Sequence, residues 1–110
     1  MTEQELMRRA LELARQAQAE GEIPVGAVIA RNGEIVAEGR NDRERAHSAL
    51  GHAEIRAIDA ACRRLGRWRL NDCELYVTLE PCPMCAGAVL NSRIEHVWYG
   101  TDDPKSGCAG

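Results

Sequence analysis

Apolar residues recur along the chain at two spacings. Near the N-terminus they repeat every three or four positions and share one face of a helix predicted over residues 2–19: Leu6, Ala10, Leu13, Ala14 and Ala17. Thr2 and Glu5 are spaced as a capping box, which marks the start of this helix. The same spacing predicts a second helix over 52–65, with its buried face formed by Ile55, Ile58, Cys62 and Leu65 and widened by Ala57 and Ala61.

Short apolar runs predict four strands, at residues 23–30, 35–38, 74–79 and 96–99. Asn32-Gly33 lies between the first two, so they should form an antiparallel hairpin. A third helix is expected over 83–92, because Pro83 suits a first helical turn. The last two strands flank this helix and should therefore be parallel.

This order of elements predicts an α/β fold with a mixed central sheet and helices packed on both faces. The 110 residues fit a single domain over 1–110. Aromatic residues are only 4% of the chain and Phe is absent, so the core must consist of Ala, Val, Ile and Leu.

Composition excludes some function classes. The chain has 14 Lys and Arg against 17 Asp and Glu, a formal charge of -3, which is not typical of a nucleic-acid-binding protein as a whole. Any such binding must be local, and the arginines at 63, 64, 67 and 69 are interpreted as a solvated helix end. Five cysteines, no signal peptide and no membrane-length apolar run predict a reducing, cytoplasmic location without membrane insertion.

Cys82 and Cys85 form a C-x2-C pair in a turn after a predicted strand. Alone, such a pair is compatible with a redox site, half of a structural zinc site, or two ligands of a catalytic zinc. His52 and Glu54 begin the preceding helix, and both helix N-termini should lie at the same end of the sheet. His52, Cys82 and Cys85 would then bind one zinc with a fourth position open, and Glu54 would carry protons. Helix N-termini should also favour the thiolate forms of the cysteines.

Two alternatives remain at this point. A closed structural zinc site needs a fourth ligand, but the remaining candidates lack conventional spacing: His47, Cys73, His96 and Cys108. Glu54 could instead be an ordinary surface glutamate in the first turn of a helix.

The motifs His52-Ala53-Glu54 and Pro81-Cys82-Pro83-Met84-Cys85 resemble the signature of the zinc nucleoside and nucleobase deaminases. Flanking stretches narrow the resemblance to the bacterial tRNA-specific adenosine deaminases of the cytidine/deoxycytidylate deaminase superfamily. These stretches are Ile23-Pro24-Val25-Gly26-Ala27-Val28, Val77-Thr78-Leu79-Glu80, Ala86-Gly87-Ala88, Asn91-Ser92-Arg93-Ile94 and Asp103-Pro104-Lys105-Ser106-Gly107.

This resemblance implies a three-layer α/β/α fold and hydrolytic conversion of the wobble adenosine of a tRNA anticodon to inosine, with one Zn²⁺ per chain. It implies that Asn41 and the backbone of Ala53 hold the flipped base and that Val25 lines the pocket. Asp103, Lys105 and Ser106 would lie by the RNA backbone, and the protein would be a homodimer.

The chain also departs from the family pattern. Members usually continue with a fifth strand and a C-terminal helix, which this chain lacks, and residues 46–51 replace the usual Pro-Thr-Ala lead-in to the His-Ala-Glu motif. A free-base deaminase acting on guanine or cytosine, and a zinc-containing RNA-binding domain with little or no catalysis, are the alternative functions.

Overall fold

A computed structural model describes the fold of residues 1–100. Residues 101–110 lie outside this range, and with them Asp103, Lys105, Ser106 and Cys108. No helix within residues 1–100 is both long enough and apolar enough to cross a membrane.

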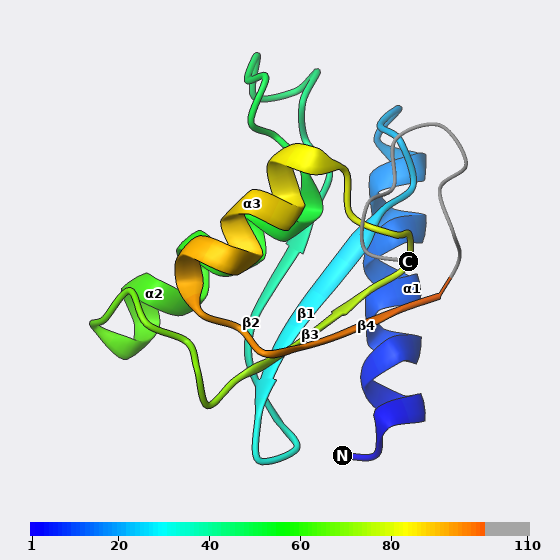
Figure 1. The fold of residues 1–110 in the computed structure, drawn as a ribbon. Coiled ribbons are helices and arrows are strands. Elements are labelled where there is room, and N and C mark those ends of the chain that lie inside the picture. Colours follow the sequence, from blue (N-terminus) through cyan, green and yellow to red (C-terminus); the bar gives the residue numbers. More distant parts are fainter. Residues whose placement is uncertain (101–110) are drawn as a thin grey trace.

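Within residues 1–100, three helices and four strands follow one another in the predicted order: α1 (Glu3–Ala19), β1 (Gly26–Arg31), β2 (Glu34–Arg40), α2 (Ala53–Leu65), β3 (Glu74–Val77), α3 (Pro83–Ser92) and β4 (His96–Tyr99). The strands form one sheet in the order β2-β1-β3-β4. β1 is antiparallel to both β2 and β3, whereas β3 and β4 are parallel (Figure 1). The predicted mixed sheet is therefore confirmed.

The helices cover opposite faces of this sheet (Figure 1). Val28, Ala30 and Tyr76 point to one face and pack with the apolar side of α1. Alternate residues of the same strands, such as Ile29 and Leu75, point to the other face and pack in the cluster that includes α2. Because strand side chains alternate between faces, one sheet supplies both cores of the α/β/α fold.

The first hairpin follows the prediction at its turn and differs at its start. Asn32 and Gly33 both have left-handed backbone conformations, with φ of 53° and 78°, as a two-residue hairpin turn requires. β1 begins at Gly26 rather than at residue 23. Pro24 has no N–H to give to a sheet, and the Val25 N–H bonds to the Ile23 carbonyl instead.

The predicted buried face of α2 was wrong in part. Its buried residues are Ala53, Glu54, Ala57, Ile58 and Ala61, whereas Ile55, Cys62 and Leu65 are only half-buried. Small side chains face the sheet because the helix backbone lies very close to it. The larger side chains are displaced toward α3.

Two glycines permit this close packing. A Cβ on Gly39 of β2 would clash with the Ala53 carbonyl and lie 2.6 Å from the Ala57 nitrogen, both in α2. A Cβ on Gly26 of β1 would clash with the Ala10 carbonyl of α1 on the opposite face. Absence of a side chain thus sets how near each helix lies to the sheet.

We predict that Gly39→Ala destabilises the protein by about 1–3 kcal/mol, because α2 must move away from β2. The same shift moves His52 and should weaken zinc binding. Denaturant unfolding and metal content measure the two effects. Gly87→Ala is the matched control, since Gly87 lies in α3 with no atom within 4 Å of the added Cβ, and it should be neutral or stabilising by up to about 1 kcal/mol.

Candidate active site

His52, Cys82 and Cys85 come together although thirty residues of chain separate the first two. The Nδ1 atom of His52 lies 3.6 Å from Cys82 Sγ and 3.5 Å from Cys85 Sγ. Within residues 1–100, this is the group of three or more His, Cys, Asp or Glu side chains whose ligand atoms gather closely enough to hold a metal ion. The expected meeting of two helix N-termini at one end of the sheet is observed.

The spacing of these atoms fits zinc. Two ligands at the tetrahedral angle, with Zn–S of about 2.3 Å and Zn–N of about 2.0 Å, lie about 3.5 Å apart. The observed nitrogen–sulfur distances have this value. One imidazole and two thiols are also a donor set that zinc prefers, and three protein ligands leave a fourth position for water.

Local structure explains why these side chains are available. His52 and Cys82 are the N-cap residues of α2 and α3, and neither uses its side chain to cap its helix. Pro83 occupies the first helical position, where its missing N–H costs nothing, and Cys85 follows on the first turn of α3. All three ligands therefore start from rigid helix ends.

The protonation of the ligands is set by burial. Burial, and then the positive charge of Arg43, lower the pKa of His52, which favours the neutral imidazole that binds metal. Burial chiefly raises the pKa of the Cys85 thiol, and the negative charges of Glu54 and Cys82 act in the same direction. Without a metal, burial therefore favours the thiol form of Cys85, in the direction opposite to the effect expected of the helix N-terminus.

Glu54 is not an exposed residue, since only 4% of its surface is accessible. Burial raises the pKa of its carboxyl group, while hydrogen bonds with its own N–H and with Cys85 act in the opposite direction. A carboxyl group whose pKa is raised, held near a metal site, is better suited to both accept and donate a proton than an ordinary glutamate.

A cavity of about 230 Å³ joins these groups. Five of its lining residues belong to the predicted site: Val25, Asn41, His52, Glu54 and Cys82. Four others were not predicted: Ile23, Arg43, Leu79 and Glu80. Three of these four could have been found from their neighbours in the sequence. Ile23 lies two residues before Val25, and Leu79 and Glu80 connect β3 to the turn that carries the cysteines.

Asn41 and Ala53 are coupled in a way that the sequence does not reveal. The Ala53 N–H donates a 2.8 Å hydrogen bond to Asn41 Oδ1, and Asn41 is buried. The Ala53 amide therefore orients the Asn41 side chain instead of pointing freely at a ligand. The Asn41 amide nitrogen is then the group directed to other partners.

The remaining described cysteines and histidines lie apart from this centre. Cys62 Sγ donates to the Trp68 carbonyl, and Cys73 is buried beside Asp72, with burial raising its pKa to about 11. His47 and His96 are exposed and are not members of the ligand group found in the part of the chain that the structure describes.

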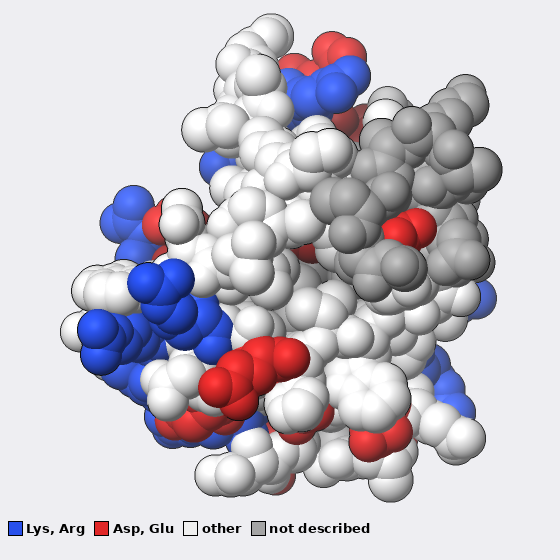
Figure 2. Space-filling view, in the orientation of Figure 1, with Lys and Arg blue, Asp and Glu red and all other residues white. Residues whose placement is uncertain are grey.

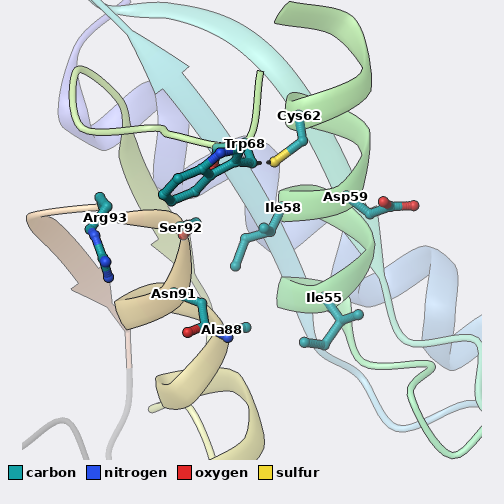
Figure 3. A pocket seen from close by; sticks show the side chains of 9 residues that line it. All are labelled: Ile55, Ile58, Asp59, Cys62, Trp68, Ala88, Asn91, Ser92 and Arg93. Carbon is teal, nitrogen blue, oxygen red and sulfur yellow. Dashed lines mark hydrogen bonds between the residues drawn. The ribbon is translucent and has the colours of Figure 1, made fainter. Parts of the chain in front are cut away.

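A larger cavity of about 580 Å³ lies between α2 and α3 (Figure 3). Apolar side chains such as Ile55 and Ile58 line it, and Trp68 and Arg93 border it. None of its lining residues is a zinc ligand or Glu54. Basic side chains gather over the C-terminal end of α2 nearby (Figure 2), but Arg63 and Arg67 are paired with Asp59 and Asp72.

Comparison with known proteins agrees with this geometry. Residues 1–101 match the family described as the cytidine and deoxycytidylate deaminase zinc-binding region. The chain belongs to this family. Its members are zinc enzymes that remove amino groups from bases by hydrolysis.

The chain is also similar to individual deaminases whose substrates are named. The chain is 54% identical to a tRNA-specific adenosine deaminase of Bacillus subtilis (strain 168), over 100% of this chain and 69% of that protein. A solved structure from a study of A-to-I editing by tRNA:A34 deaminases has a TM-score of 0.92 and 43% identity, covering 94% of this chain and 75% of that one. Guanine deaminase from Bacillus subtilis has a TM-score of 0.89 and 41% identity, covering 93% and 66%.

We predict that His52→Ala, Cys82→Ser and Cys85→Ser each lose zinc, because each removes one of three protein ligands. Cys62→Ser and Cys73→Ser should keep it, since neither thiol faces the centre. Metal analysis of the purified variants tests this, and zinc loss in either control would mean that the ligand set is a different one.

The raised pKa of Cys85 gives a second prediction. The Cys85 thiol carries its proton in the metal-free protein and must release it to bind zinc, so zinc affinity should rise with pH and fall in acid. Titration calorimetry in buffers of different ionisation enthalpy should show that zinc binding releases protons. Release of none would mean that the Cys85 thiolate is preformed.

Proposed function

We propose that this protein hydrolyses the wobble adenosine of a tRNA anticodon to inosine, using one zinc ion per chain. The observation that carries the proposal is a cluster of three potential zinc ligands, two of which, His52 and Cys82, line the same base-sized cavity as the buried Glu54. The substrate assignment draws support from the 54% identity to a tRNA-specific adenosine deaminase.

His52, Cys82 and Cys85 would hold the zinc. When bound, zinc lowers the pKa of a coordinated water toward neutrality and so supplies a nucleophile for C6 of adenine. Asn41, fixed by the Ala53 N–H, would donate its amide hydrogens to the base, and Val25 would pack against it.

Glu54 would carry the protons of the reaction. It accepts a proton from the attacking water, delivers it to N1 of the base, and then assists proton transfer to the departing amino group. The C6–N bond breaks as the C6–O double bond forms, so adenosine and water give inosine and ammonia. The burial of Glu54 keeps this proton within the site.

An RNA substrate suits the open side of the cavity. Ile23 and Arg43 line it and are exposed, so a ligand can continue from the cavity onto the surface. Anticodon loops are single-stranded and can place one base in a pocket without opening a duplex.

Guanine deamination is the second candidate, because a guanine deaminase is also a close structural match at 41% identity. A free purine uses the same zinc, Glu54 and Asn41, but it needs no extension of the ligand beyond the cavity. Cytosine deamination, and a zinc-containing RNA-binding domain without turnover, are the remaining alternatives.

We also propose that residues 1–110 form a single deaminase domain and that the protein is a cytoplasmic homodimer. Asp103, Lys105 and Ser106 would contact the RNA. Those three residues lie outside the described range.

We expect Glu54→Ala to retain its zinc and lose activity on an anticodon stem-loop by about 10²–10⁴-fold, because proton transfer loses its carrier. Inosine is measured by nucleoside analysis of the digested RNA, with zinc content as the folding control.

Parallel incubations with guanine and cytosine test the substrate class. Release of ammonia from guanine or cytosine, without inosine in the RNA, would mean that the substrate is a free base and not a tRNA. If the Glu54→Ala variant keeps its activity, Glu54 does not carry the protons of the reaction.

A further inference from the structure

Arg43 is a cation of the catalytic cavity that the chemistry above does not use. It lines the cavity together with Asn41 and His52, and its side chain is exposed. Assuming the proposed function, we propose that Arg43 binds a phosphate group of the RNA strand whose base occupies the cavity.

The charge of Arg43 is free to act on a ligand, unlike that of its neighbours. Arg40 and Arg45 both pair with Glu20, and Arg56 pairs with Asp42. Arg43 forms no ion pair with any residue in the range 1–100. An exposed guanidinium without an ion-pair partner, beside a base-sized cavity, is suited to bind an anion from solution.

The backbone around Arg43 is held from outside the loop. Glu22 is buried, with 7% of its surface accessible. Its two carboxylate oxygens accept the N–H groups of Glu44 and Arg45, at 3.0 and 2.8 Å. This carboxylate takes no part in the proposed chemistry, and its contacts fix the two residues that follow Arg43.

Contacts within the loop also hold the backbone of Arg43. The Arg43 carbonyl accepts a 3.1 Å hydrogen bond from the Ser48 N–H, and Gly51 packs so closely that an added Cβ would lie 2.7 Å from Arg43 Cα. A fixed backbone removes the cost of ordering the loop when a ligand binds. The backbone of Arg43 is therefore held at the rim of the cavity before substrate arrives.

The chemistry of the substrate identifies the anion. When a base enters the cavity, the phosphates of its nucleotide stay at the rim, because burying a charged phosphodiester beside the Glu54 carboxyl group is costly. Guanidinium groups bind phosphate oxygens with paired, charge-assisted hydrogen bonds. The chain as a whole carries a formal charge of -3, so attraction to RNA has to come from local cations such as Arg43.

Binding of a labelled anticodon stem-loop tests this assignment directly. The measurement uses zinc-loaded Glu54→Ala protein, so that no RNA is consumed, and is repeated over a series of salt concentrations. Arg43→Gln added to this background should weaken binding about tenfold, as expected for loss of a charged hydrogen bond. It should also reduce the slope of log affinity against log salt by about 0.7, the value for one single-strand phosphate.

Arg45→Gln is the matched control, since it removes the same charge from the same loop. Its side chain pairs with Glu20 and does not line the cavity. It should leave both the affinity and the salt slope unchanged. With Glu54 intact, Arg43→Gln should raise KM about tenfold and leave kcat within about twofold, because phosphate contacts position the strand and do not touch the reacting atoms.

An Arg43→Gln variant with unchanged affinity and salt slope would overturn the assignment while leaving RNA deamination intact. A fall in kcat without a change in slope would also overturn it, by placing Arg43 on the base. Failure of the unmodified chain to form inosine in RNA would instead overturn the proposed function, on which this assignment rests.

Discussion

The contact between the backbone of α2 and the glycine of β2 is the constraint on which the site depends. Gly39 lets Ala53 and Ala57 lie directly against the strand. This contact fixes the first turn of α2, and with it the metal ligand His52 and the carboxyl group of Glu54. A larger residue at position 39 would move both groups together, away from the cysteines that α3 supplies from its own N-terminus.

Burial then determines the chemistry that the site can perform. The pKa of Cys85 rises and that of His52 falls for the same reason, since burial disfavours any unpaired charge. Two thiols and the Glu54 carboxyl group lie in one small volume, and a divalent cation is the partner that stabilises their ionised forms together. The arrangement therefore favours a metal centre over a thiol redox pair, which would need a single activated thiolate.

The rim of the cavity differs in character from its interior. Inside, the polar groups are buried and held by the two helix starts and by the bond between Ala53 and Asn41. At the rim, a loop held by Glu22 presents an unpaired arginine. This division suits a ligand with a neutral base and a charged backbone, which is the form of a nucleotide within a strand.

The sequence determined the order of helices and strands, the mixed sheet and the members of the His-Cys-Cys cluster, because capping residues, turn residues and metal-binding motifs act over a few positions. The capping box at Thr2, the Asn32-Gly33 turn and Pro83 all appear where they were predicted. Tertiary structure alone decided which face of α2 is buried, how Asn41 is oriented and that Arg43 lines the cavity. Each depends on residues distant in sequence that meet only after folding, and the pKa of Cys85 depends on burial, which no local pattern records.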